Sequence, residues 1–147
     1  MNSNSENNIK FNKRTLVDDL QFGKSKEIEI LPIIINYFND DIKFVEYKYS
    51  IYDYQGVKYK YELKSRTNKY LDFETTLIPE SKIKYRKNNF IKFLFYFTDG
   101  LYYIKFNETK FKKYKLENFC RNKRDDYNDV PKLYYYIPVK DLIKIDF

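Results

Sequence analysis

The sequence predicts a single mixed α/β or α+β domain with a central sheet flanked by helices. The spacing of apolar residues is helical from Thr15 to Phe38 and changes to strict alternation beyond Asp41, which is typical of strands. Phe and Tyr make up 20% of the 147 residues, and aromatic residues favour sheets. A chain of this length fits one domain. We expect that domain over residues 13–147, behind a disordered polar tail at residues 1–12.

The helical pattern begins at Thr15. Apolar residues recur at steps of three and four up to Phe38, namely Leu16, Leu20, Ile28, Leu31 and Ile35. Gly23 interrupts the run, so the pattern predicts a short helix followed by a longer one. Because proline lacks a backbone N–H, the second helix should begin near Pro32 or kink there.

Two strands should follow this helical region. Alternation predicts the first over residues 45–51, and Gln55-Gly56 marks a turn. The second, Val57 to Lys64, alternates strictly between an apolar face that includes Tyr61 and Leu63 and an exposed charged face.

The remaining chain is predicted to be mainly sheet. Residues 68–79 have the composition of a loop, and Glu80 to Asn88 form a short basic helix or an extended turn. An Asp-Gly turn joins two apolar runs into a hairpin, Phe90 to Phe97 and Leu101 to Phe106. Strands over Phe111 to Phe119 and Leu133 to Val139, then a helical turn over Lys140 to Ile145, complete the domain.

Composition excludes several kinds of chemistry. The chain has no His, so it lacks a His-assisted nucleophile, a His general base and a His-ligated zinc site. Its single cysteine, Cys120, cannot form an internal disulfide, which favours an intracellular protein. No apolar run has the length of a membrane span or the position of a signal peptide.

Positive charge is concentrated in the later part of the chain. The 28 Lys and Arg exceed the 21 Asp and Glu, and two basic clusters lie after residue 80. Their members are Lys82, Lys84, Arg86, Lys87 and Lys92, then Lys110, Lys112, Lys113, Lys115, Arg121, Lys123 and Arg124. Such clusters suit a polyanion, and they equally suit a solvated face that keeps an aromatic chain soluble.

One group of residues indicates a specific chemistry. On a strand, Glu62 and Lys64 project from the same face, with Leu63 between them. Asp53 precedes this Glu-Leu-Lys segment, and Glu27 lies on the predicted helix. The order of Glu27, Asp53 and Glu62-Leu63-Lys64, in a helix followed by strands, resembles the PD-(D/E)xK nuclease superfamily, whose members have a restriction-endonuclease-like core.

The resemblance implies hydrolysis of phosphodiester bonds, in DNA in preference to RNA, and it permits a homodimer. The expected cofactor is Mg²⁺, or Mn²⁺, with Asp53, Glu62 and the Leu63 carbonyl as protein ligands. Lys64 would orient the attacking water and contact a phosphate oxygen, and Glu27, with Glu29 as the alternative, would assist a second metal or the water. The predicted phosphate contacts are Arg66, Lys82, Lys84, Arg86 and Lys87.

Two features of the sequence qualify this resemblance. Tyr52 stands where the family often has proline before its aspartate, and the spacing from Asp53 to Glu62 is short. If Gln55-Gly56 formed a tight turn, Glu62 would lie about 13 Å along the strand from the point opposite Asp53. A bend, bulge or skewed hairpin is therefore required for the two carboxylates to meet.

The segments around Glu62 and residues 75–82 also look like nuclease-like proteins of large DNA viruses, which would place the protein in the host cytoplasm or the virion. Two other functions stay open. One is a catalytically inactive nuclease fold that binds nucleic acid or serves as a virion component. The other is a basic aromatic sheet that stacks on single strands, although Tyr134-Tyr135-Tyr136 is first interpreted as strand packing.

Overall fold

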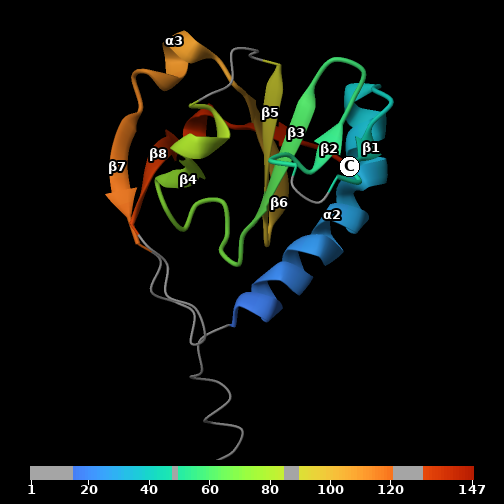
Figure 1. The fold of residues 1–147 in the computed structure, drawn as a ribbon, viewed down its shortest axis with the longest axis horizontal. Helices are drawn as coiled ribbons and strands as arrows, with labels where there is room; N and C mark the ends of the chain where they lie inside the picture. Colours follow the sequence, from blue (N-terminus) through green and yellow to red (C-terminus); the bar gives the residue numbers. More distant parts are fainter. Residues whose placement is uncertain (1–14, 48–49, 85–89, 121–130) are drawn as a thin grey trace, which may run out of the picture.

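A long helix and a small sheet lie on opposite sides of a larger mixed sheet (Figure 1). The computed structural model describes residues 15–47, 50–84, 90–120 and 131–147. The tail expected at residues 1–12 lies outside these ranges, as do Arg86, Lys87 and residues 48–49 of the first predicted strand. The α+β class with a central mixed sheet is confirmed. The long helix flanks one face only, because strands cover the other.

The larger sheet has six strands in the order β1-β2-β3-β5-β6-β9. They are β1 Lys43–Phe44, β2 Tyr54–Gln55, β3 Lys60–Ser65, β5 Ile91–Phe97, β6 Gly100–Lys105 and β9 Ile143–Ile145. β3 and β5 are parallel neighbours, whereas the other pairs are antiparallel. Since β2 has only two residues, the later half of β3 has no paired strand on the β2 side, and the candidate site lies there.

The smaller sheet has the order β4-β8-β7 and is antiparallel. Its strands are β4 Thr75–Pro79, β8 Lys132–Pro138 and β7 Lys115–Phe119. Three short helical segments connect the strands of the two sheets, namely η1 Glu80–Lys82, α3 Glu108–Phe111 and η2 Val139–Asp141.

The helix α2, Leu16–Phe38, is continuous, so the predicted break at Gly23 is wrong. A glycine inside a helix costs only about 1 kcal/mol relative to alanine, which the rest of a 23-residue helix can offset. Thr15 begins the helix in a reciprocal capping box with Asp18. Pro32 is accommodated within the helix.

Several strand boundaries differ from the sequence pattern. The strand predicted over residues 45–51 is wrong, because β1 lies before it and none of its described residues belongs to a strand; residues 75–79 of the predicted loop form β4. A short helix, α3, precedes β7 where one strand was expected, and the predicted C-terminal helical turn is η2 followed by β9. Two of these strands, β4 and β9, depend on pairing partners distant in sequence, β8 and β6, which local periodicity does not reveal.

The hairpin of β5 and β6 is confirmed. Phe97 pairs with Gly100, so Thr98 and Asp99 form the loop and Gly100 already belongs to β6. The apolar run from Ile91 to Phe97 fits a strand covered on both faces.

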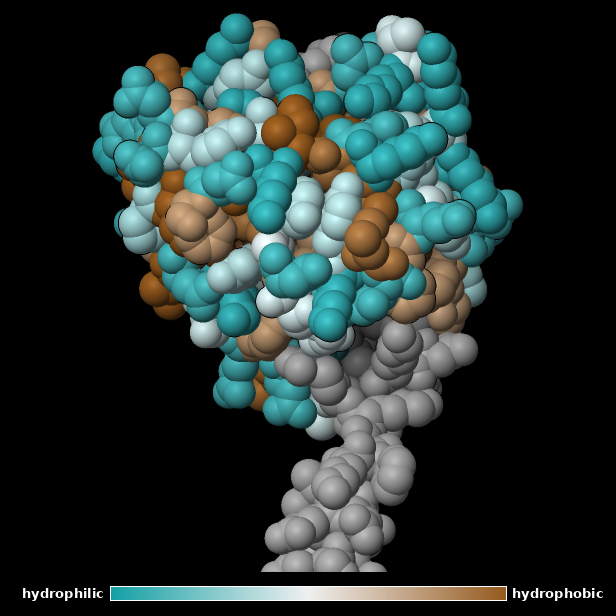
Figure 2. Space-filling view, turned by 180° about the vertical axis from the view of Figure 1, so that it is seen from behind, coloured by the Kyte–Doolittle hydropathy of each residue, from teal (hydrophilic) through white to brown (hydrophobic). Residues whose placement is uncertain are grey.

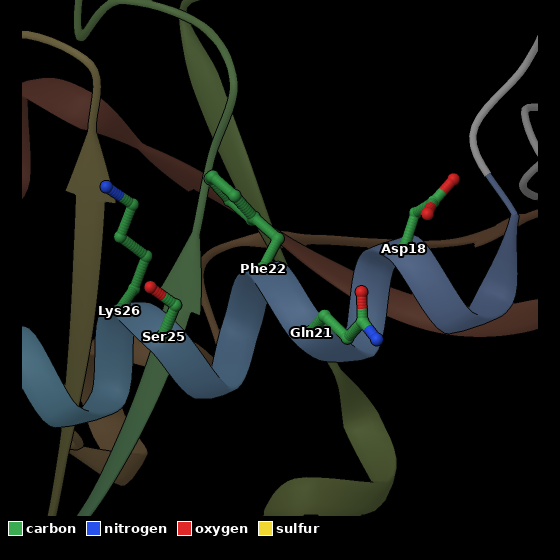
Figure 3. Close-up of a pocket in the computed structure, with 5 residues that line it drawn as sticks. All are labelled: Asp18, Gln21, Phe22, Ser25 and Lys26. Atoms are coloured by element: carbon green, nitrogen blue, oxygen red, sulfur yellow. The ribbon is translucent and has the colours of Figure 1, made fainter.

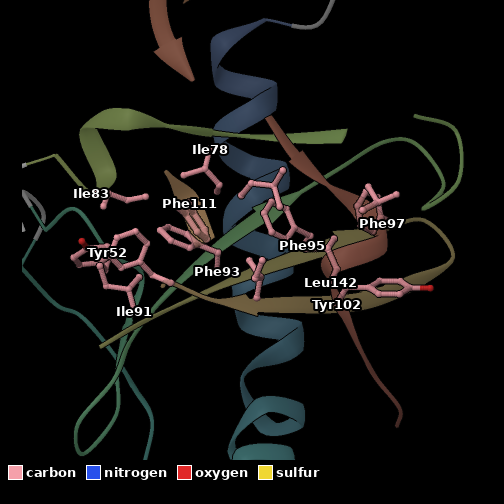
Figure 4. Packing of buried hydrophobic residues seen from close by; sticks show 14 residues of the cluster. Tyr52, Ile78, Ile83, Ile91, Phe93, Phe95, Phe97, Tyr102, Phe111 and Leu142 are labelled. Carbon is pink, nitrogen blue, oxygen red and sulfur yellow. The ribbon is translucent and has the colours of Figure 1, made fainter. Parts of the chain in front are cut away.

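Two hydrophobic clusters fill the spaces between the three layers. Ile30 and Ile34 of α2 pack on Tyr61 and Leu63 at one face of the larger sheet. The other face packs on the smaller sheet through a cluster that includes Phe93, Phe95, Phe97, Ile78 and Ile137 (Figure 4). β3 and β5 are therefore covered on both sides. Of the charged side chains that β3 turns toward the smaller sheet, Glu62 is buried, Lys64 is partly exposed and Lys60 is exposed.

Figure 2 shows the molecule from behind, with a mostly hydrophilic surface interrupted by separate apolar patches. Within the described residues, no helix is long and apolar enough to cross a membrane.

Candidate active site

The charged face of β3 points into the molecule. Tyr61 and Leu63 turn toward α2, so Glu62, Lys64 and Arg66 turn toward the smaller sheet. The sequence pattern predicted that this face would be exposed, which holds for Lys58 and Lys60 but is wrong for Glu62. The Glu62 residue is only 2% exposed, because β4 of the smaller sheet and the following segment η1 cover it.

The hairpin before Glu62 has the register that the metal-site hypothesis requires. Tyr54 pairs with Tyr61 and Gln55 with Lys60, and the Asp53 N–H donates to the Tyr61 carbonyl at 3.0 Å. The same register continues to place Asp53 opposite Glu62. Residues 56–59 form a wider loop than the two-residue turn that would have separated the carboxylates.

Asp40 holds this wider loop in place. Its carboxylate accepts hydrogen bonds from the Val57 N–H at 2.9 Å and from the Tyr61 hydroxyl at 2.7 Å. A Cβ added at Gly56 would lie 2.0 Å from Asp40 Oδ2, so the close approach requires glycine. The turn predicted at Gln55-Gly56 is wrong in position, because Gln55 belongs to β2 and the chain reverses over residues 56–59, where the Gly56 N–H donates to the Tyr59 carbonyl at 2.8 Å. The Asp40 side chain that contacts this loop lies outside the hairpin.

The Asp53 side chain is hydrogen-bonded to β3, the strand that carries Glu62. Its Oδ2 accepts a hydrogen bond from the Leu63 N–H at 2.7 Å, and its side chain also hydrogen-bonds to that of Glu62. Burial and the neighbouring Glu62 charge raise the pKa of the Asp53 carboxyl to about 8. The raised pKa keeps a proton on Asp53 at neutral pH, beside the Glu62 carboxylate.

Two ammonium groups neutralise Glu62. Lys64 Nζ lies 3.1 Å and Lys82 Nζ 2.7 Å from Glu62 Oε2. Burial alone would raise the pKa of Glu62, but Lys64 and Lys82 hold it below its usual value. Lys82 also donates to the Ile51 carbonyl at 2.6 Å, so a carboxylate and a carbonyl both bind its ammonium group.

Glu27 lies near this cluster on α2. The Tyr54 hydroxyl donates to the Glu27 carbonyl at 2.7 Å, which fixes this turn of the helix beside β2. Burial raises the pKa of Glu27, and the charge of Glu62 adds to the effect. Glu29, the alternative candidate, instead accepts a hydrogen bond from the Tyr96 hydroxyl at 2.5 Å. Of the two helix residues, Glu27 is therefore the one near enough to be affected by the charge of Glu62, whereas Glu29 is bound to Tyr96.

The donor set fits a hard divalent cation. Lys60 and Arg66 donate their N–H groups to the β5 side, whereas Tyr61 and Leu63 turn theirs to the Asp53 side. Since N–H and C=O of one strand residue point the same way, the Leu63 carbonyl also faces Asp53.

Within the described residues, no three acidic or cysteine side chains form a group that could hold a metal by themselves. Mg²⁺ commonly uses one or two carboxylates and keeps several waters, so Asp53, Glu62 and the Leu63 carbonyl are an adequate set.

The residues predicted to contact phosphate have different surroundings. Arg66 donates to Thr76 Oγ1 at 3.1 Å and to the Leu77 carbonyl at 2.7 Å, which joins β3 to β4. Lys82 belongs to the carboxylate cluster, and Lys84 is exposed beside a shallow polar hollow next to β8. Arg86 and Lys87 lie outside the described residues.

Sequence reasoning missed the role of Lys82 and the residues that hold it. The Tyr52 hydroxyl donates to the Lys82 carbonyl at 2.6 Å, and Ile51 supplies the carbonyl that Lys82 Nζ contacts. Tyr52 thus anchors η1 from the position that the family often gives to proline. Nothing local in the sequence marks this contact, because the two segments are about 30 residues apart.

A separate hollow lies along the N-terminal half of α2. Figure 3 shows the five residues that line it, Asp18, Gln21, Phe22, Ser25 and Lys26. All five come from one helix, and Asp18 is already engaged in the capping box. This hollow is distinct from the carboxylate cluster.

Comparisons with protein-family models, with curated proteins and with solved structures return no match for this chain.

Proposed function

We propose that the protein is a metal-dependent nuclease with a restriction-endonuclease-like core, which hydrolyses phosphodiester bonds by means of Asp53, Glu62 and Lys64. The observation that carries the proposal is the register of β2 and β3, which joins Asp53 to the Glu-Leu-Lys segment. A buried carboxyl pair with an adjacent lysine is costly to a fold, and such groups concentrate at functional sites.

The order of elements also supports the proposal. A helix carrying Glu27 precedes an antiparallel hairpin with Asp53 and Glu62, and the next strand of the sheet, β5, runs parallel to β3. This arrangement agrees with the resemblance that the sequence motif implied. The three-stranded sheet lies over the site face of β3 and restricts access to it.

Asp53, Glu62 and the Leu63 carbonyl would hold Mg²⁺ or Mn²⁺. Such a cation, when bound, stabilises negative charge on a phosphate and acidifies a water. The chain's own residues position the reactants: Glu62 orients the Lys64 ammonium, and Lys64 can donate to a phosphate oxygen or align the water. Glu27 supplies a further carboxylate from the helix side.

The test is cleavage of supercoiled plasmid, branched DNA and single-stranded oligonucleotides with Mg²⁺ or Mn²⁺, beside EDTA. We expect metal-dependent cleavage that Lys64→Met lowers at least about 100-fold, as removal of a transition-state contact does. Glu62→Gln should have a similar effect, and it keeps the size of the buried side chain.

Lys60→Met is the matched control, because Lys60 lies on the same strand and face as Lys64 but is exposed. It should retain cleavage close to that of the wild type. Equal activity in Lys64→Met and Lys60→Met would refute the assignment of Lys64 as a catalytic residue.

A second candidate is a nucleic-acid-binding protein that keeps the fold without catalysis. The observation that favours it is the ion pair of Lys82 with Glu62, because this ammonium competes with a cation for the same oxygen. Wild-type protein that binds DNA or RNA and cleaves neither with any divalent metal would support this second function.

A further inference from the structure

A cavity of about 380 Å³ opens beside Lys64, on the outer side of the smaller sheet. Its walls include Lys64, Arg66, Phe73, Phe119, Tyr134 and Tyr136. A volume of this size lies within the range of small-ligand sites, about 300–1,000 Å³. The cavity is thus large enough for a planar organic group, and it is adjacent to the residues proposed for cleavage.

Strand alternation gives the cavity its aromatic character. Tyr135 and Ile137 of β8 turn toward the hydrophobic cluster between the sheets, so Tyr134 and Tyr136 turn to the outer face. Phe119 contacts Tyr134 edge-on, with ring centroids 5.9 Å apart. The Phe119 residue is 41% exposed and Phe73 is 63% exposed, which is unusual for large apolar side chains.

The charge beside these rings is positive. Lys64 and Arg66 lie at the cavity edge near β3, and none of the residues that line the cavity is acidic. Lys82 adds a second ammonium group beside Lys64, and both contact the Glu62 carboxylate. The described residues that line the cavity therefore carry positive charge and no negative charge.

The neighbouring strand adds another cation. Lys115 Nζ lies 4.9 Å from the centre of the Tyr136 ring and 3.2 Å from the Glu117 carboxylate. Glu117, the acidic residue of β7, is thus paired on its own strand.

We propose that this cavity binds an unpaired nucleobase of a single-stranded nucleic acid, with the phosphates of the strand directed to Lys64 and Arg66. Aromatic rings on a sheet beside a basic groove are the standard means of binding single strands, because every base has a face that can stack. The bases of a duplex are stacked inside the helix and cannot reach the rings. An aromatic peptide would find no acidic partner for its own positive groups here, so the charge favours a polyanion.

This inference rests on the proposed function in one respect: it assigns a single-stranded or locally unpaired substrate to the site where cleavage is proposed. The test is binding in EDTA, where cleavage is absent. Labelled dT and rU oligonucleotides of about 15 nucleotides, and a duplex of equal length, are titrated with wild-type protein by fluorescence anisotropy. We expect either single strand to bind at least about tenfold more tightly than the duplex.

Tyr136→Leu and Phe119→Leu should each weaken single-strand binding at least about fivefold, because each removes a stacking surface. Tyr136→Phe keeps the ring and should bind as the wild type does, which separates loss of stacking from loss of fold. Phe147→Leu is the matched control, since Phe147 is 73% exposed at the C-terminus and does not line the cavity.

The proposal is overturned if neither single strand binds, or if the two leucine variants at the cavity bind like Phe147→Leu. The outcome is independent of catalysis. If the protein cleaves but its binding does not depend on Tyr136 and Phe119, the base site is refuted and the nuclease proposal stands. If binding depends on these rings but no metal supports cleavage, the base site stands and the nuclease proposal is refuted.

Discussion

β3 and β5 are parallel neighbours, and both lie between α2 and the smaller sheet. They nevertheless turn opposite kinds of side chain toward the smaller sheet. Glu62 pairs with Phe93 and Lys64 with Phe95 in the register. β5 presents Phe93, Phe95 and Phe97 to the smaller sheet, whereas β3 presents Glu62 and Lys64, and Arg66 follows directly after β3. Burying ions is expensive, and well-packed apolar residues commonly serve stability as well or better. The difference fits the proposed function, in which β3 carries the reactive groups while β5 serves packing.

The largest expected effect comes from removing Glu62 from the charged group that it forms with Lys64 and Lys82. Glu62→Ala should lower the free energy of unfolding by about 3–5 kcal/mol, because Lys64 and Lys82 would lose their shared counter-ion in a buried site. Urea denaturation measures the change.

A triple variant then separates function from stability. Glu62→Leu with Lys64→Met and Lys82→Met replaces these three charged side chains with apolar ones, as in β5, and should restore wild-type stability or exceed it. If the triple variant is as unstable as Glu62→Ala, the three charges stabilise the fold and the comparison with β5 fails.

The pH dependence of stability should be next in size. The folded pKa of Asp53 is about 8, whereas an unfolded aspartate has a pKa of about 3.9. The folded state therefore binds one proton more than the unfolded state between these values, and the free energy of unfolding falls as pH rises. We expect a loss of about 2 kcal/mol from pH 6 to pH 8, measured by urea denaturation in EDTA.

The absence of histidine makes this measurement unusually clear, because no imidazole titrates in the same interval. Asp53→Asn should remove most of the slope. An equal slope in the wild type and Asp53→Asn would show that Asp53 is ionised in the folded protein at neutral pH.

The hairpin loop should respond to a smaller change. Gly56→Ala would place a Cβ 2.0 Å from Asp40 Oδ2, and the hydrogen bonds from Val57 and Tyr61 hold that carboxylate in place. We expect a loss of about 1–3 kcal/mol, which is typical of overpacking. Gly100→Ala, at the β6 end of the other hairpin, is the control, since its Cβ would lie 3.1 Å from a Tyr102 ring atom. An equal cost at both glycines would argue against a special role for the Asp40 contact.

Lys82 gives a prediction about metal affinity. Because its ammonium group contacts the Glu62 oxygen proposed for the cation, Lys82→Met should tighten binding of Mn²⁺ by about fivefold to tenfold. Titration calorimetry compares it with Lys84→Met, which changes an exposed lysine two residues away. Weaker Mn²⁺ binding in Lys82→Met than in Lys84→Met would mean that Lys82 supports the site instead of competing for it.

The smallest effect concerns the helix on the opposite face. A Cβ at Gly23 would meet no atom within 4 Å, so Gly23→Ala should raise the free energy of unfolding by about 0.5–1 kcal/mol. Thermal denaturation measures this gain, and cleavage should be unchanged. A destabilised Gly23→Ala would show that α2 requires glycine at this turn.

The sequence was informative wherever the signal was local. The alternation around Glu62, the hairpin of β5 and β6, and the start of α2 at Thr15 all follow from residue spacing. Asp53 and Glu62 do lie opposite each other, not through a bend, a bulge or a skewed hairpin but because the chain reverses over residues 56–59, and only the structure shows the Asp40 contacts with this loop.

The parts that could not be predicted depend on contacts distant in sequence. The charged face of β3 was expected in solvent because alternation gives the face of a side chain but not what covers it. β4 lacked a recognisable strand pattern until its pairing with β8 was known, and Lys82 reaches Glu62 only because η1 follows β4 across the site. Local spacing therefore identified the candidate residues, and the tertiary contacts determine which of them meet.

The most direct measurement is a calorimetric titration of wild-type protein with Mn²⁺ at about pH 8.5, where Asp53 is ionised. The account predicts saturable binding that Asp53→Asn abolishes and Glu29→Gln leaves unchanged, since Glu29 lies with Tyr96 away from the pair. Absence of binding to the wild type at millimolar Mn²⁺, or equal binding to all three proteins, would contradict a metal site at Asp53 and Glu62.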